Sequence, residues 1–321
     1  MRRFNIRIYQ LYDFIELIFI IVGIIGSVCS IWSVYSSEPS LKQAIIVAIS
    51  IVTCGTIISL IKIRKLRKVA ITNLENLSKC FHATAHHVRN QHAAICKRFK
   101  NGEKQLTLEE LNLNLNNVCK IVLDNLSTIL NEITGEKINV CIKYFCIDQP
   151  VYFSKLTHEE KENLCVTVLS RCKYSENRRS NTKDKIIDNT DLKWITFEKY
   201  KHFAEPDLES FNRRLQETTK FEKYLDSNSS WKDTYKAKIT VPIQLDMSFL
   251  RNSAVEGKSY DLLGFITADS PSTSAFRDDN LEYMVEICKA FADVIYRYLE
   301  RYIYLCGELH NKNGNTNSTC S

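Results

Sequence analysis

The sequence Leu262-Leu263-Gly264-Phe265-Ile266-Thr267-Ala268-Asp269-Ser270 predicts a β-strand, and the elements around it define the fold of this 321-residue chain. Residues 236–243 predict a second strand, which a long loop separates from the first. From Asp278 to about Tyr302, apolar residues recur at three- and four-residue steps and predict a helix. The last part of the chain therefore reads as strand, loop, strand and long helix.

A helix and two further strands are expected upstream. Thr107-Leu108-Glu109-Glu110 has the spacing of a capping box, in which Thr107 caps the new helix and Glu110 reaches back. One apolar face then continues to Ile133, and Gly135 stands where a left-handed exit is wanted. Within residues 138–147 and within 164–169, β-branched and aromatic residues recur at alternate positions, which predicts two strands.

The section from Arg171 to Ser230 is the most polar and the least regular part of the chain. One short helix is expected in it, from Asp207 to Leu225. Mixed charge with a few aromatic residues is typical of a pocket lid, and also of any long surface excursion.

These elements resemble the GAF domain family. The matching pieces are Thr240-Val241-Pro242-Ile243, the strand 263–270, Phe276 and the long terminal helix, and the resemblance covers residues 107–302. It implies an α+β domain: an antiparallel sheet with helices on one face and a pocket closed by the irregular middle on the other. An antiparallel sheet needs one covered face, and the first and last helices each offer an apolar stripe for it.

GAF domains bind small molecules such as cyclic nucleotides, tetrapyrroles or metabolites, and they commonly dimerise through terminal helices. This sequence departs from the best-marked subgroups. It has no Asn-Lys-x-x-Phe signature of the cyclic-nucleotide phosphodiesterase modules, and no cysteine in the setting of a chromophore attachment site. The resemblance therefore implies a ligand without naming it, and the cofactor is unknown.

The N-terminal part predicts a transmembrane hairpin over residues 14–63, after a basic stretch at 1–13. Phe14 to Val34 carries only the charge of Glu16, and Ala44 to Ile61 carries none, so both runs are long enough to span a bilayer. Pro39 lies in the break between them. Arginine and lysine flank the hairpin on its outer sides, which places both termini in the cytoplasm of a two-span inner-membrane protein.

A connecting helix is expected from 64 to 101. Apolar residues fall on a heptad grid at Leu74, Leu77, Phe81, Val88 and Ile95, with Thr84 and Gln91 at its other positions. The pattern fits a parallel coiled coil that makes a homodimer, or a helix packed on its own domain.

Four histidines lie on the connecting helix, and His82 and His86 are one turn apart. Solvated helix surface is the preferred interpretation, because a third ligand for a metal is missing from the local pattern. The string 86–90 also resembles the phosphoacceptor box of sensor histidine kinases, but His87 replaces its acidic residue and no ATP-binding boxes follow. That alternative is kept only for phosphotransfer from another protein.

The candidate ligand site comprises Arg171, Arg178 and Arg179, at the exit of the predicted strand 164–169, with Tyr174 and Trp194 as stacking faces. A guanidinium there can grip phosphate or carboxylate in bidentate fashion, so an anionic or mixed polar–aromatic ligand is expected. The alternative is a mixed-charge loop that faces water.

Several function classes are not supported by the composition. The formal charge of +6 is smaller than the number of basic residues that flank the membrane hairpin, so the rest of the chain is close to balanced. The charge therefore does not indicate nucleic-acid binding. The twelve cysteines contain no C-x-x-C, and no metal site or enzyme motif is found. Four cysteines lie on or beside predicted strands, at positions 141, 146, 165 and 172. Their preferred interpretation is that of small buried thiols, and the alternative is that they reduce methionine sulfoxide in a pocket, as in some GAF-like proteins. Residues 306–321 lack apolar periodicity and predict a disordered tail.

The sequence leaves two candidate functions, a preferred one and an alternative. The first is a membrane-anchored, non-enzymatic GAF-like sensor that binds a cytosolic small molecule, for which a nucleotide is one candidate. It passes the signal through the connecting helix to the membrane hairpin or to a partner protein. The second, an analogy of layout, is a two-span effector of a bacterial antiphage system activated by a nucleotide second messenger.

Overall fold

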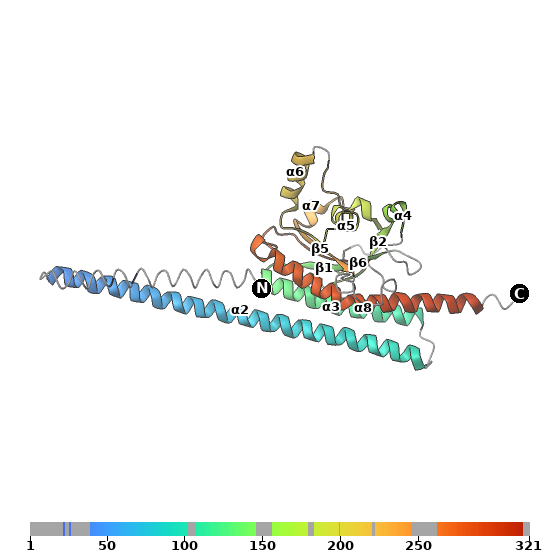
Figure 1. Ribbon diagram of the computed structural model, residues 1–321, viewed down its shortest axis with the longest axis horizontal. Helices are drawn as coiled ribbons and strands as arrows, with labels where there is room; N and C mark the ends of the chain where they lie inside the picture. The colour runs from blue at the N-terminus through green and yellow to red at the C-terminus, as the bar shows by residue number, and fades with distance from the viewer. Residues whose placement is uncertain are drawn as a thin grey trace, which may run out of the picture. The chain divides into compact units, whose positions relative to one another are not determined.

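The computed structural model describes residues 22, 26, 39–101, 107–145, 156–178, 183–198, 200–219, 222–244 and 262–316 (Figure 1). The chain divides into two compact units, residues 1–75 and 76–321, which are considered separately. The long helix α2 (Pro39–Asn101) contributes residues to both.

The expected membrane hairpin is not supported by the structure. Among the residues that the structure describes, no helix is long and apolar enough to cross a membrane. The first expected span, Phe14 to Val34, lies outside the described residues apart from Val22 and Gly26, as does the basic stretch 1–13. Ala44 to Ile61 is helical within α2, but most of its side chains are outside the description. The two-span topology stays a prediction.

Within the described residues of the second unit, six strands form one antiparallel sheet in the order β3-β2-β1-β6-β5-β4. They are β1 (Asn139–Phe145), β2 (Cys165–Arg171), β3 (Asp184–Lys185), β4 (Phe203–Glu205), β5 (Ala237–Gln244) and β6 (Leu262–Ser270). All four expected strands are confirmed, and β6 lies at the centre between β1 and β5. The sequence did not predict β3 and β4, because two or three residues are too few to show alternation.

Two long helices cover one face of the sheet: α3 (Leu108–Thr134) and α8 (Asp278–Thr316) (Figure 1). The start of α3 is as expected, since Thr107 and Glu110 form both bonds of the capping box. Gly135 ends it with φ 70°. The apolar residues of both helices form one core with the inward-facing side chains of β1, β5 and β6.

The terminal helix is longer than expected. It continues to Thr316, so the segment from 306 is helical where a disordered tail is expected, and only 317–321 lie outside the description. No proline interrupts residues 306–316. A helix that has already nucleated can extend through polar residues without a new apolar face.

The second face of the sheet carries short helices, which corrects the expectation of helices on one face only. They are α4 (His158–Glu162), α5 (Thr190–Thr196), α6 (Leu208–Thr219), α7 (Trp231–Thr234) and the 3₁₀ turn Ile186–Asp188. Of these, α5, α6 and α7 contribute to a second, aromatic-rich core on this face (Figure 1). The expected helix from Asp207 ends at Thr219 instead of Leu225. Except for α6, these helices have at most two turns, too few to show an apolar stripe.

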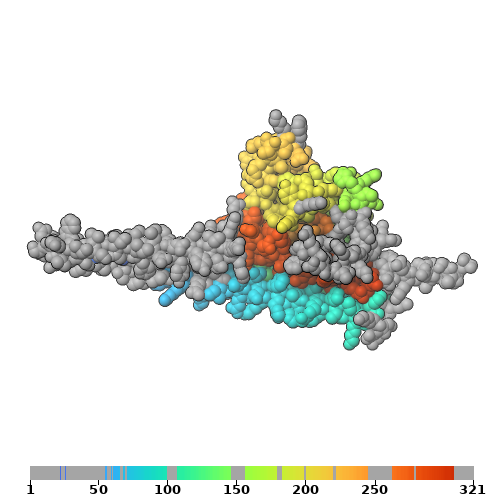
Figure 2. Space-filling model, in the orientation of Figure 1, coloured from blue at the N-terminus to red at the C-terminus, as the bar shows by residue number. Residues whose placement is uncertain are grey.

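The last part of α2 packs on its own domain. We call residues 76–101 the arm; Figure 2 shows it, in teal, along α8. Val88 and Ile95 are buried in the core of α3 and α8, and the Phe81 ring meets Phe291 edge-on at 5.5 Å. The polar grid position Thr84 is buried too, and it accepts a 2.8 Å hydrogen bond from Asn125.

This packing favours the second interpretation of the heptad grid, a helix packed on its own domain. The side chains expected at a coiled-coil seam are used within the domain, except Leu74, which is 50% exposed. A dimer through Phe81, Val88 and Ile95 would require the arm to leave the domain. The expected homodimer remains a prediction.

Candidate functional site

Polar side chains cross the sheet on the face that the short helices cover. Asp269 of β6 lies opposite both Asn139 of β1 and Lys238 of β5. Two residues earlier in β6, at the next position on the same face, Thr267 lies opposite Cys141 of β1 and Thr240 of β5. We call these six residues the polar rows. Directly opposed residues of antiparallel strands share a face, so the strand register gathers all six on one side of the sheet.

Hydrogen bonds link the side chains of the polar rows. Asn139 Nδ2 donates to Asp269 Oδ1 over 3.2 Å, and the thiol of Cys141 lies 2.9 Å from the hydroxyl of Thr267. Arg178, in the turn after β2, donates through Nη1 to both carboxylate oxygens of Asp269, at 2.8 and 3.0 Å. The turn after β2 is thereby fixed to the centre of the sheet.

A buried lysine lies at the heart of this face. Lys238 Nζ contacts Asp191 Oδ2 at 2.8 Å and Asp226 Oδ2 at 3.0 Å, and all three side chains are almost completely buried. Two tyrosines also donate to Asp226, from Tyr235 at 2.5 Å and from Tyr224 at 3.1 Å. We call these five residues the lysine–aspartate cluster. It connects β5 to α5 and to the segment that follows α6.

The charged groups of this cluster stabilise the ionised forms of one another. Burial lowers the pKa of Lys238, but the carboxylates of Asp191 and Asp226 outweigh it and raise the pKa well above its ordinary value. Burial raises the pKa of Asp226, while Lys238, Lys143 and the bonds from Tyr235 and Asn228 bring it down to about 2. Burial raises the pKa of Tyr224 and of Tyr235. At neutral pH the cluster thus holds an ammonium, an ionised Asp226 and two protonated phenols.

Burying such a cluster on the face of a sheet costs desolvation free energy. Desolvation of buried ions costs several kcal/mol each, and apolar side chains of similar volume are often as stabilising or more so. Two further cations of this face are also paired, Lys143 with Asp184 at 3.1 Å and Arg178 with Asp269 at 2.8 Å. The face therefore carries paired charges of both signs rather than a single excess charge.

The structure brings together only part of the predicted site. Arg178 lies on the polar rows, and Arg171 ends β2 opposite Cys141, on the same face. Arg179 lies outside the described residues. The Trp194 ring stacks on Tyr200 at 5.1 Å and Tyr174 is 40% exposed beside Lys173, so neither ring faces the polar rows as a stacking platform.

Sequence reasoning missed Lys238, Asp191 and Asp226. A signal exists for Lys238, because Lys238 and Thr240 alternate with apolar residues along β5, which marks a polar face on a strand that is buried on both sides. Nothing local marks the two aspartates. They come from segments 35 residues apart, and only the fold brings them to one lysine.

Two of the four cysteines singled out in the sequence are buried: Cys141 on this face, and Cys172 in the core with α3 and α8. Cys141 bonds Thr267 as above, and Cys172 Sγ accepts from the backbone N–H of Val140 at 3.2 Å. Cys165 is partly exposed, and Cys146 lies outside the described residues. The expected role as small buried side chains fits Cys141 and Cys172.

The histidines of the arm form no metal site in the described part of the chain. His82 and His86 stack edge-on with ring centres 4.2 Å apart, and Arg89 Nη2 lies 2.6 Å from His86 Nδ1. Over the described residues, no group of three His, Cys, Asp or Glu is placed to hold a metal ion.

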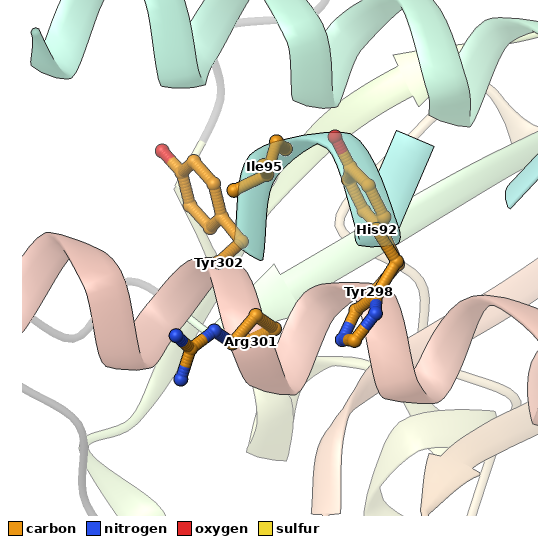
Figure 3. Close-up of a pocket in the computed structure, with 5 residues that line it drawn as sticks. All are labelled: His92, Ile95, Tyr298, Arg301 and Tyr302. Carbon is orange, nitrogen blue, oxygen red and sulfur yellow. The ribbon is translucent and has the colours of Figure 1, made fainter. Parts of the chain in front are cut away.

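A small crevice lies where the arm meets α8. His92 and Ile95 of the arm line one side, and Tyr298, Arg301 and Tyr302 of α8 line the other (Figure 3). Burial lowers the pKa of His92, and the positive charges of Arg301 and Arg297 lower it further against a smaller opposing effect of Glu300. The charged form of His92 is therefore disfavoured in the folded chain.

Protonation of His92 is expected to weaken the fold in mild acid. Its pKa is lower in the folded than in the unfolded chain, so the unfolded chain takes up the proton first and stability falls as the pH drops through the ordinary value of about 6.5. We expect the urea midpoint to fall between pH 7.5 and about pH 5.5, and to fall less in His92→Gln. Equal pH dependence in the two proteins would show that His92 does not contribute.

Comparison with known proteins gives structural similarity without a family assignment. No family model matches the chain, and no curated protein matches its sequence. A putative GAF sensor protein from Burkholderia vietnamiensis is 12% identical over 70% of this chain and 98% of its own, with a TM-score of 0.36. The GAF domain of an Acinetobacter phosphoenolpyruvate-protein phosphotransferase is 10% identical over 70% and 93%, with a TM-score of 0.36.

A type II free methionine-R-sulfoxide reductase from Thermoplasma acidophilum is also similar, with 14% identity over 57% of this chain and 96% of its own and a TM-score of 0.34. The solved structures similar to this chain therefore include GAF domains as well as enzymes. Neither ligand nor activity follows from similarity at this level.

Proposed function

We propose that this chain is a membrane-anchored regulatory protein whose domain binds a cytosolic small molecule over the polar rows and passes that binding to the arm. The observation that carries the proposal is the lysine–aspartate cluster. It places buried ions of both signs on the one sheet face that is covered by short helices and connecting segments. Apolar side chains of similar volume would often stabilise the face as well, so stability alone does not account for these ions.

The arm supports the second half of the proposal. It packs directly on α3 and α8, which are the helices that cover the other face of the same sheet. Asn125 of α3 and Phe291 of α8 each contact it. A ligand that shifts the sheet against its helices therefore acts on the surface that holds the arm. Membrane anchoring rests on the two long apolar runs in the sequence, of which the first carries only the charge of Glu16 and the second carries none.

A ligand panel tests the binding site. The full chain in detergent micelles is screened by thermal shift against cyclic mono- and oligonucleotides, haem and common metabolites. For any hit, Arg178→Gln is expected to weaken affinity about tenfold or more, because it removes a charge-assisted contact or frees Asp269 to repel an anion. Arg214→Gln is the control, since Arg214 pairs with Glu205 on the exposed side of α6. Equal affinity in both variants would move the site elsewhere.

The effector alternative differs in its output. In that proposal the same ligand, a nucleotide second messenger, would make the two N-terminal runs permeabilise the bilayer. Vesicles that contain the full chain and a trapped dye distinguish the two functions. Release of the dye only when the ligand is added favours the effector, and retention with ligand bound favours the sensor.

The non-enzymatic character is also a proposal. Free methionine-R-sulfoxide, the substrate named for one similar structure, is the substrate to test. We expect no turnover by the purified chain with a thiol reductant. Turnover that is lost in Cys141→Ser or Cys172→Ser would instead identify a reductase.

A further inference from the structure

The part of α2 that follows its uncharged run is densely basic. Five of the seven residues from Lys62 to Lys68 are lysine or arginine, and we call residues 62–68 the basic segment. The segment lies within the one continuous helix α2 (Figure 1). Four of its cationic side chains are described, and all four are exposed: Lys62, Arg64, Lys65 and Lys68. Residues three and four apart on a helix are neighbours, so these cations form one charged surface.

No acidic residue of α2 lies close enough along the helix to neutralise this surface. The helix has no aspartate or glutamate between Pro39 and Leu74, and its first carboxylate, Glu75, follows Lys68 by seven residues. Side chains of a helix pair when they are three or four residues apart, and like charges at that spacing repel one another. An anionic partner would therefore relieve an unfavourable arrangement.

The apolar residues around the basic segment indicate which anionic partner fits. Ile61 directly precedes the segment and is 61% exposed, and Ile71 follows it by three residues and is 55% exposed. The uncharged run from Ala44 to Ile61 belongs to the same helix. An apolar run joined to a cluster of cations is typical of a helix at a membrane surface, where apolar side chains enter the acyl region and long cationic side chains reach the headgroups.

A nucleic acid fits the same surface less well. Its phosphates would attract the cations too, but a phosphate backbone offers nothing to exposed isoleucines. Proteins that bind single strands supply aromatic side chains on which the bases stack, and residues 39–80 contain no Phe, Tyr or Trp. The headgroup of an acidic lipid lies directly beside an apolar phase, so it can satisfy both kinds of side chain.

We propose that the basic segment binds the headgroups of anionic phospholipids, with Arg64 holding one phosphate through two N–H groups and the three lysines adding point charges. The inference rests on the membrane anchoring proposed above and goes beyond it. Anchoring needs only apolar runs and any bilayer, whereas this contact selects lipids by their charge. The basic segment belongs to the unit 1–75 and the polar rows to the unit 76–321, so Arg178→Gln should leave lipid selection unchanged.

Lipid selectivity of the full chain, reconstituted in phosphatidylcholine bilayers, tests the proposal. Electron spin resonance compares the association of spin-labelled phosphatidylglycerol and spin-labelled phosphatidylcholine with the protein. We expect phosphatidylglycerol to be preferred about fivefold or more at low salt, which is the effect of one basic side chain at an anionic surface. The preference should fall in about 0.5 M salt, because the contact is electrostatic and exposed.

Two variants locate the contact. The basic-segment variant carries Lys62→Gln, Arg64→Gln, Lys65→Gln and Lys68→Gln, and it should lose most of the preference. Glutamine has a helix propensity close to that of lysine and arginine, so α2 is retained. The matched control removes the same charge from exposed lysines of the other unit, through Lys183→Gln, Lys185→Gln, Lys223→Gln and Lys232→Gln, and it should keep the preference. Equal association of the two lipids with the unmodified chain, or equal preference in the two variants, would overturn the proposal.

Flotation with vesicles of phosphatidylcholine alone tests the anchoring separately. If the full chain does not float with them, anchoring fails, and flotation with phosphatidylglycerol vesicles then measures the headgroup contact with the same two variants. A fluorescent DNA duplex is added to the reconstituted chain as the last probe. Duplex binding that the basic-segment variant loses, without any preference for phosphatidylglycerol, would assign the segment to nucleic acid and overturn the proposal.

Discussion

Lys238→Met is expected to lower the free energy of unfolding by about 3–5 kcal/mol, the usual result of removing one member of a buried ion pair. Methionine has the length of the lysine stem, so it leaves no large cavity, but Asp191 and Asp226 are then buried as carboxylates without their counter-ion. Urea denaturation of the full chain measures the loss as a shift of the midpoint.

A triple variant separates charge from shape. Adding Asp191→Asn and Asp226→Asn to Lys238→Met removes both stranded charges and is expected to recover a large part of the lost stability. If Lys238→Met alone costs less than about 1 kcal/mol, the charges are not desolvated as the structure places them.

Gly264→Ala is expected to cost more than about 3 kcal/mol, beyond the usual range for overpacking. Gly264 lies in β6 between Tyr144 of β1 and Ile243 of β5. A Cβ there would lie 2.9 Å from the Tyr144 Cα and closer still to the Lys143 carbonyl oxygen. Both are backbone atoms, so the methyl group fits only if β1 and β6 move apart.

Gly135→Ala is the matched control. Its φ is 70°, but no atom lies within 4 Å of the added Cβ, so the cost is limited to about 1–2 kcal/mol of backbone strain. The Gly264 variant should therefore have much the lower urea midpoint, or fail to fold. Similar midpoints would mean that β1 and β6 are not paired at Gly264.

Local sequence predicted the elements that carry their own signal. The capping box at Thr107, the exit at Gly135 and the strand at 262–270 are all found as expected, because each depends on residues within one element. The apolar stripe of the arm was also correct. Its partner was left open, since Val88 and Ile95 are equally suited to a second copy and to α8.

The candidate site was predicted less well for a physical reason. Arginines near the end of β2 could be placed at one edge of a pocket, and Arg178 does reach the sheet face. Its partner Asp269 lies 91 residues away, and Asp191 and Asp226 reach Lys238 only through the packing of α5 and the segment after α6. Aromatic residues such as Trp194 have no mark that separates a ligand platform from a core, and the structure uses that ring in the core.

The central claim is that ligand binding over the polar rows alters the arm. Hydrogen exchange of the full chain, with and without the compound found in the ligand panel, tests it most directly. We expect changed protection in two places at once: around α5 and residues 222–235, which cover the polar rows, and along the arm from 76 to 101. Protection that changes over the polar rows while the arm exchanges as before would contradict it.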